Sequence, residues 1–203
     1  MCNVCLCRMP QVSWRDVEDN PLLRCLWNRY DVEAAGSSLY YNTSSEFHNL
    51  FVLLKYRGRP HVGEYMAQYA FPQWHALGLG RGAEFIIPVP LARQRQWHRG
   101  YNQAGWIARG ISKVTGIPVC HSVLRRVLNN PTQTRRTAVQ RMENASGVFA
   151  VGDKSPDLNG KIVLLVDDIF TTGATIGDCV RALRQDFPSI RIHIYTLGWA
   201  GER

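Results

Sequence analysis

The stretch KIVLLVDDIFTTGATIGD, residues 161–178, decides the fold class of this 203-residue chain. Its first part is an aliphatic run, which is typical of a strand buried on both faces of a parallel sheet. Asp167 and Asp168 follow the run directly, and a Thr-Thr-Gly-Ala-Thr turn stands behind them at 171–175. The stretch therefore predicts a buried strand, then two carboxylates, and then a polar turn that begins a helix.

This arrangement predicts a ligand site at the end of the strand. Ligands of open parallel sheets bind beyond the carboxyl ends of the strands, where the two aspartates fall. The turn offers the free backbone amides of a helix start to a phosphate, and its glycine lets the backbone curl around the anion. The carboxylates suit a vicinal diol, so the pair and the turn together describe a ribose with a 5-phosphate. The predicted phosphate-binding residues are Thr171, Thr172, Gly173, Ala174 and Thr175.

Other kinds of site fit the stretch less well. A Walker A loop requires a lysine after its glycine, and none is present there. Receiver domains also have paired acids after an aliphatic strand, but near the beginning of the domain, and no hydroxyl-glycine turn need follow. Gly-Leu-Gly-Arg-Gly at 78–82 resembles a dinucleotide loop only superficially, because it follows an expected helix rather than a strand. A solvated turn after a strand would explain a bare pair of aspartates, but the aliphatic run before this pair and the hydroxyl-glycine turn behind it favour a ligand site.

The rest of the chain alternates between expected helices and expected strands. Apolar residues at helical spacing predict helices at 44–58, 61–74, 101–116 and 174–187. Short apolar runs predict strands at 84–91, 118–127, 147–151, 161–168 and 190–200. This alternation indicates an α/β fold, a three-layer parallel sheet with helices on both faces. We expect a small, irregular, cysteine-containing N-terminal segment at 1–44 and one domain at 45–203.

The composition is that of a globular protein, with 45% hydrophobic and 20% charged residues. No apolar run approaches the roughly 18 to 20 residues that a membrane-spanning helix requires. The first residues also lack the charged and then apolar profile of a signal peptide. We therefore expect a cytoplasmic protein without membrane insertion.

Positive charge is concentrated in one part of the chain. Between Arg81 and Arg141 there are eleven lysines and arginines and one acid, Glu84, while the whole chain has a net charge of +8. A basic stretch of this kind suits a polyanion, which is either a nucleic acid or a phosphorylated small molecule. A solvated basic face is the simpler alternative.

Four segments carry a resemblance to a known family. VLLVDDIFTTGAT at 163–175 resembles the phosphoribosyl pyrophosphate (PRPP) motif of type I phosphoribosyltransferases. LLKYRG at 53–58, PVPLARQRQWHRGYNQ at 88–103 and TQTRRTAVQRMENASGVF at 132–149 are similar to segments of the ComF/GntX family of competence-associated phosphoribosyltransferase-like proteins. The resemblance covers about residues 45–200. It implies a parallel-sheet core, PRPP binding with magnesium, and a bacterial link to DNA uptake.

Several basic residues fit the pyrophosphate part of such a site. A backbone turn at Pro90 and Leu91, with Arg95 and Arg99 close behind, suits a pyrophosphate leaving group because arginine forks match phosphate oxygens. Lys55, at the end of a helix, either approaches the same anion or stays solvated.

The polar, arginine-rich segment at 128–146 lies where type I enzymes carry a flexible lid over the substrate. The expected lid residues are Gln133, Arg135, Arg136 and Arg141. Tyr101, Asn102 and Gln103 begin the helix before this segment, and each of them fits either a cap or a packing position.

The cysteines near the start raise the question of a metal. In the ComF family a zinc ribbon precedes the core, and Cys-Asn-Val-Cys at 2–5 resembles its second Cys-x-x-Cys pair. A structural zinc ion takes four ligands, and the candidates are Cys2, Cys5, Cys7 and Cys25. Their spacing is irregular, so a truncated remnant of the ribbon is the simpler interpretation.

Two functions stay open on the sequence alone. The first is an enzyme that transfers phosphoribose from PRPP to an unidentified nitrogen acceptor, with Asp167 and Asp168 holding the ribose and magnesium and arginines stabilising the departing pyrophosphate. The second is an accessory protein of DNA uptake that keeps the PRPP site as a sensor or relic. Such a protein would contact single-stranded DNA or partner proteins through its basic stretch. The oligomeric state also stays open, with a homodimer as one alternative.

Overall fold

The computed structural model describes residues 8–27, 29–45, 47–92, 97, 99–127 and 147–201. Within these ranges, four parallel strands form a central sheet in the order β1-β6-β5-β2. They are β1 (Ala34–Tyr40), β2 (Phe85–Pro88), β5 (Ile162–Phe170) and β6 (Arg191–Trp199). The predicted fold class, an α/β protein with a parallel sheet, is confirmed.

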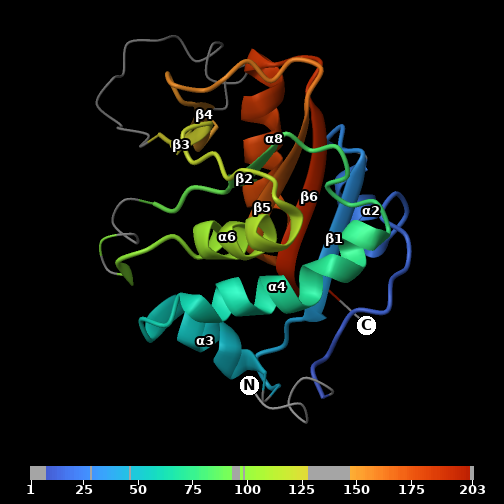
Figure 1. Ribbon diagram of the computed structural model, residues 1–203, viewed down its shortest axis with the longest axis vertical. Coiled ribbons are helices and arrows are strands. Elements are labelled where there is room, and N and C mark those ends of the chain that lie inside the picture. The colour runs from blue at the N-terminus through green and yellow to red at the C-terminus, as the bar shows by residue number, and fades with distance from the viewer. Residues whose placement is uncertain are drawn as a thin grey trace, which may run out of the picture.

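Helices cover both faces of this sheet. On one face lie α3 (His48–Tyr56), α4 (His61–Ala76) and α6 (Gln103–Thr115), which gather in the lower part of Figure 1. The other face is covered by α2 (Pro21–Trp27) and by α8 (Ala174–Asp186), which rises in the upper part of Figure 1. No helix of the described ranges is both long and apolar enough to span a membrane.

The structure contains a strand that the sequence did not predict. The residues of β1, Ala-Ala-Gly-Ser-Ser-Leu-Tyr, lack the β-branched side chains that are typical of strands, yet most of them are buried. A Cβ added to Gly36 would lie 2.7 Å from the Trp74 ring, so only a small residue fits there. The Ser38 hydroxyl accepts a hydrogen bond from Trp74 Nε1 (3.2 Å) and shares one with the Tyr195 hydroxyl (2.6 Å). Tertiary neighbours therefore determine this strand.

The residues before position 45 share one core with the rest of the chain. Leu22, Leu23 and Leu26 of α2 are buried together with the central strands. The Tyr40 amide donates to the Pro10 carbonyl at 2.7 Å, which attaches the N-terminal segment to β1. The expected boundary between 44 and 45 therefore does not coincide with a gap in the packing.

The expected strand at 118–127 is only partly correct. Val119 forms a single parallel bridge to Ile86 of β2, and the chain then bends at 121–123. Beyond the bend, β3 (Leu124–Arg126) pairs antiparallel with β4 (Phe149–Val151) in a separate two-stranded ribbon. The two segments therefore belong to a ribbon that packs near α8 rather than to the central sheet.

Helices α4 and α6 cross at very close distance. A Cβ added to Gly110 of α6 would overlap the backbone carbonyl of Glu64 and lie 2.8 Å from the Ala67 Cβ. The buried Glu64 carboxylate forms ion pairs with Lys113 and, at 3.7 Å, with Arg109. The hydrogen bond from Lys113 is the main reason why the pKa of Glu64 is lowered. These contacts hold α6 in place where it packs against β2 and β5.

Candidate functional site

Two carboxylates lie near the carboxyl end of β5, as the sequence predicts. Because alternate residues of a strand point to opposite faces, Asp167 and Asp168 approach the site from different sides. Asp168 forms an ion pair with Lys55 of α3, with 3.2 Å between Oδ2 and Nζ. Asp167 Oδ1 instead accepts a hydrogen bond from the Asp168 amide at 2.8 Å. The negative charge of Asp168 is therefore paired, whereas Asp167 has a neutral partner.

The environment of Asp167 favours its protonated form. Burial raises the pKa of this carboxyl group to about 8, and the negative charge of Asp168 adds to the effect. In the register of the sheet, Asp167 lies beside Thr196 of β6, which lies beside Ser37 of β1. Both hydroxyl oxygens are buried and have no hydrogen-bond partner within the described part of the chain. A row of buried polar groups therefore crosses the sheet beneath the acidic pair.

The turn between β5 and α8 curls tightly at Gly173. Gly173 has a φ of 77°, and an added Cβ would lie 2.8 Å from the Phe170 ring. Glycine is therefore needed at this position. Helix α8 begins at the next residue, Ala174, and Thr171 and Thr175 border the same pocket as the acidic pair. The start of a helix and two threonines thus stand at the edge of the pocket, where a phosphate binds favourably.

The loop after β2 forms another wall of this pocket. Pro90 and Leu91 border it directly. Asn102 connects the loop to α6, because its Nδ2 donates to the Val89 carbonyl at 2.9 Å and its Oδ1 accepts from the Ala104 amide at 3.1 Å. Of the two alternatives for Asn102, the cap is therefore correct, and the same side chain also fixes the loop.

Arg99 and Gln103 supply hydrogen-bond donors to the same pocket. Arg99 Nη1 donates to Gln103 Oε1 at 3.2 Å, and its guanidinium lies over the Tyr56 ring, 4.9 Å from the centroid. Gln103 is only 2% exposed, and its Nε2 has no hydrogen-bond partner among the residues that the structure describes. An unpaired buried amide is unfavourable, so this nitrogen is available to an oxygen of a ligand.

All these groups surround one space of about 340 Å³, which we call the acid-pair pocket. Its lining includes Tyr56 and Arg126, which the sequence did not single out. Arg126 comes from β3, where its guanidinium lies 5.3 Å from the Phe149 ring. In the sequence, Arg126 is marked only by its place in the basic stretch between Arg81 and Arg141. Within the described lining, three cations, Lys55, Arg99 and Arg126, accompany the two carboxylates.

Most of the predicted site residues lie at this pocket or beside it. The residues that line it are Lys55, Pro90, Leu91, Arg99, Asp167, Asp168, Thr171 and Thr175. Thr172, Gly173 and Ala174 complete the adjoining turn. The predicted residues outside the described ranges are Arg95, Gln133, Arg135, Arg136, Arg141, Cys2, Cys5 and Cys7.

The described residues bear differently on the two predicted metal sites, one for zinc and one for magnesium. Within the described ranges, no three histidine, cysteine or acidic side chains come together as a metal site. Cys25 is an exposed free thiol, so the zinc prediction depends on cysteines outside those ranges. A magnesium ion bound with a diphosphate takes most of its ligands from phosphate and water, and needs only one or two carboxylates. Asp167 and Asp168 fit that requirement.

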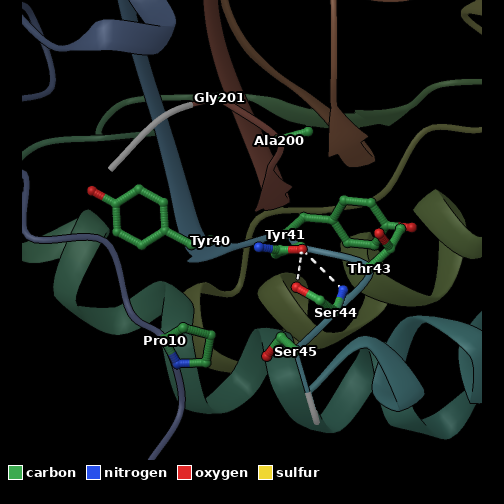
Figure 2. Close-up of a pocket in the computed structure, with 9 residues that line it drawn as sticks. Pro10, Tyr40, Tyr41, Thr43, Ser44, Ser45, Ala200 and Gly201 are labelled. Carbon is green, nitrogen blue, oxygen red and sulfur yellow. Dashed lines mark hydrogen bonds between the residues drawn. The ribbon is translucent and has the colours of Figure 1, made fainter.

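A larger cavity, of about 750 Å³, opens at the carboxyl ends of β1 and β6, and we call it the edge cavity. Figure 2 shows residues 40–45 on one side of it and Ala200 and Gly201 on another. Dashed lines in Figure 2 mark two hydrogen bonds within the loop, from the Ser44 amide (2.9 Å) and hydroxyl (2.8 Å) to Asn42 Oδ1. Tyr41 lines both the edge cavity and the acid-pair pocket, so the two spaces adjoin.

Comparison with known proteins finds a matching family model and several relatives. The family model described as phosphoribosyl transferase domain matches residues 99–201. Competence protein F of Haemophilus influenzae is 37% identical over 102 residues, which are 50% of this chain and 44% of that protein. Competence protein ComFC of Bacillus subtilis is 30% identical over 112 residues, which are 55% of this chain and 43% of that protein. The chain thus spans less than half the length of these two curated relatives.

A solved structure described as the allosteric regulatory enzyme of purine biosynthesis is also similar. Its TM-score is 0.44 at 20% identity, and the match covers 68% of this chain and 25% of that one.

Proposed function

The chain belongs to the phosphoribosyl transferase domain family, and from this premise we propose that it binds PRPP with magnesium and transfers phosphoribose to a nitrogen acceptor. The observation that carries the proposal is the composition of the acid-pair pocket. Two carboxylates, a glycine turn at a helix start and three cations surround one space of about 340 Å³. A ribose with a phosphate at one end and a diphosphate at the other requires these three kinds of group.

Each wall of the pocket binds one part of PRPP in this proposal. The carboxylates of Asp167 and Asp168 accept hydrogen bonds from the two ribose hydroxyls. The turn at 171–175 binds the 5-phosphate through the backbone amides at the start of α8. Arg99 and the loop after β2 bind the diphosphate. Lys55, which pairs with Asp168 when the diol is absent, moves to the diphosphate when the diol takes its place.

The residues of the pocket also account for the transfer step. When bound, magnesium supplies positive charge to the departing pyrophosphate. Arg99 and Arg126 supply the same from the protein, and their guanidinium groups match phosphate oxygens. Asp167 and Asp168 hold the ribose while the anomeric carbon gains oxocarbenium character. The pocket therefore provides electrostatic stabilisation and positioning, and no covalent intermediate is needed.

The names of the relatives suggest the biological setting. Competence protein F, Competence protein ComFC and a DNA utilization protein each match about half of this chain. We infer that this phosphoribosyltransferase-like chain acts in competence, in the uptake or use of DNA.

Calorimetric titration with magnesium and PRPP tests the proposed function. Wild type should bind, and Asp168→Asn should bind at least about ten-fold more weakly, because a charge-assisted hydrogen bond contributes roughly 1.5 to 3 kcal/mol. Asp178→Asn is the matched control, since Asp178 lies on α8, pairs with Arg181 at 2.8 Å and does not line the pocket. This variant should bind as wild type does. Failure of wild type to bind millimolar PRPP in the presence of magnesium would refute the proposal.

A further inference from the structure

We propose that His193 is a pH-sensitive latch, which holds the glycine-rich turn at 78–82 closed while its imidazole is neutral and releases the turn when the imidazole is protonated. The turn, Gly-Leu-Gly-Arg-Gly, connects α4 to β2. Its residues line neither the acid-pair pocket nor the edge cavity. The inference therefore does not depend on the proposed function.

The contacts of His193 determine which of its two ring nitrogens carries hydrogen. The residue lies near the start of β6, at the opposite edge of the sheet from the acidic pair, and is only 8% exposed. Its Nδ1 accepts a hydrogen bond from the Gly80 amide at 3.0 Å, and its Nε2 lies 3.7 Å from Glu33 Oε2. Because a backbone amide only donates, Nδ1 is the bare nitrogen, and the ring hydrogen sits on Nε2, which faces the carboxylate.

A proton on Nδ1 is incompatible with this arrangement. It would bring two N–H donors face to face and leave the buried Gly80 amide without an acceptor, which is unfavourable. Burial also lowers the pKa of His193 below its ordinary value of 6.5, an effect that Glu33 opposes and Arg191 reinforces. Below about pH 6.5 the opened turn therefore binds a proton that the closed turn excludes, so the closed turn becomes less stable as pH falls.

The other charged and titratable groups around the latch do not compete for this role. They are Glu33 before β1, Glu18 before α2, Arg191 on β6, Arg81 in the turn and His75 on α4. The register partner of His193 on β5 is the apolar Leu164. The Glu33 carboxylate is already paired, because Arg191 Nε donates to both of its oxygens at 2.8 and 3.1 Å. His75 Nδ1 lies 3.1 Å from the Leu79 carbonyl, to which it must donate, so protonation of His75 preserves its contact with the turn.

The backbone of the turn makes this contact important. Its three glycines have φ values of 110°, 70° and 74°, in the region that favours glycine. Glycine gains more conformational freedom on release than any other residue, so the turn needs contacts that fix it. The amides of Arg81 and Ala83 donate within the turn, at 3.0 and 3.1 Å, whereas the Gly80 amide donates to His193. The latch therefore ties the middle of the turn to the central sheet.

Nitrogen NMR of the histidine rings tests the latch in the unmodified protein. At about pH 7, His193 should carry its hydrogen on Nε2, and on acidification it should take up the second proton only below about pH 6.5. Comparison with the spectrum of His193→Asn assigns the signals. Hydrogen on Nδ1 at about pH 7, or titration of His193 at or above about pH 6.5, would overturn the inference.

Hydrogen exchange measures the release of the turn. The exchange rate of the Gly80 amide, divided by the rate of an unstructured chain at the same pH, gives the opening equilibrium. This equilibrium should increase at least about five-fold between about pH 7 and about pH 5, because a buried amide loses its acceptor. The amides of α8, on the other face of the sheet, are the internal reference for global unfolding and should not show this increase. Equal opening of the turn at both pH values would contradict the latch.

Two matched variants assign the effect to one histidine. In His193→Asn, the amide oxygen takes the position of Nδ1 and accepts from Gly80 but does not titrate, so opening of the turn should be independent of pH. His75→Asn is the control, because His75 contacts the same turn as a donor, and this variant should keep the pH dependence of wild type. The inference fails if the pH dependence persists in His193→Asn or disappears in His75→Asn. If His193→Asn does not fold, the NMR titration of wild type still decides.

Discussion

Burial of the Asp167 carboxyl group in the site lowers the stability of the fold, and the size of this effect depends on pH. Its pKa of about 8 lies above the ordinary value of 3.8, so the folded state binds more protons than the unfolded state between these values. The free energy of unfolding therefore falls as pH rises through that window. Asp167→Asn cannot ionise, and we expect its stability to exceed that of wild type by a margin that grows from about pH 5 to about pH 8. The margin should grow by up to about 1.4 kcal/mol per pH unit in urea unfolding experiments.

A second carboxylate substitution controls for loss of charge alone. The side chain of Asp153 is 93% exposed, so Asp153→Asn should leave the margin flat across the same pH range. Parallel stability curves for Asp167→Asn and wild type would show that burial of Asp167 has no such effect. The stabilised Asp167→Asn variant should nevertheless bind PRPP more weakly, because an amide cannot give up a proton to become the carboxylate that accepts the hydrogen bonds of the diol.

Among the helices, α6 needs a glycine, Gly110, where it packs closely against α4. Gly110→Ala places a methyl group on the Glu64 carbonyl and the Ala67 side chain, and should lower stability by about 1 to 3 kcal/mol, as overpacking does. Gly105→Ala in the same helix meets the exposed His121 ring at 3.3 Å, which can move aside, and should gain up to about 1 kcal/mol from helix propensity. Urea midpoints compare the two variants. Equal midpoints would show that α4 and α6 do not need the glycine.

The elements that the sequence predicted well are those whose own residues decide their structure. Strand β5 and helix α8 follow the expected ranges closely, because an aliphatic run and a helical stripe each bury their own side chains. Strand β1 was not predicted because small residues form it, and the reason for them, the Trp74 ring against Gly36, is distant in sequence. The segment at 118–127 has the composition of a strand along its whole length. Only its residues 124–126 pair with β4, and this pairing is not visible in the composition.

The same distinction applies to the site. The acidic pair and the turn are contiguous in sequence, so their residue types already describe a ribose and a phosphate. The role of Arg126 depends on the antiparallel ribbon, and that of Gln103 on a buried amide left without a partner. Neither the ribbon pairing of Arg126 nor the unpaired amide of Gln103 can be recognised from the residues next to it in the sequence. The edge cavity likewise forms only where the ends of β1 and β6 meet.

Considered as a whole, the molecule should not fold without its first 44 residues. Among the described residues of that segment, four leucines are buried, namely Leu22, Leu23, Leu26 and Leu39. At roughly 1.5 to 3 kcal/mol each, they contribute about 6 to 12 kcal/mol. This equals the whole net stability of an ordinary domain, about 5 to 15 kcal/mol. We expect a fragment of residues 45–203 to show no cooperative transition in thermal circular dichroism, whereas residues 8–203 should melt as the full chain does. A cooperative melt of the shorter fragment near the same temperature would contradict this.

The three cations of the acid-pair pocket also determine how the ligand-free protein behaves in ordinary buffers. While Asp167 keeps its proton, three positive charges stand against the single negative charge of Asp168, which leaves the lining at +2. Phosphate and sulfate ions have the charge and the oxygen geometry of phosphoryl groups, so they enter such a lining as competitors. Affinities for PRPP measured in phosphate buffer will therefore be lower than those measured in zwitterionic buffers of equal ionic strength. The difference narrows above about pH 8, because ionisation of Asp167 then lowers the charge that attracts the competing anion.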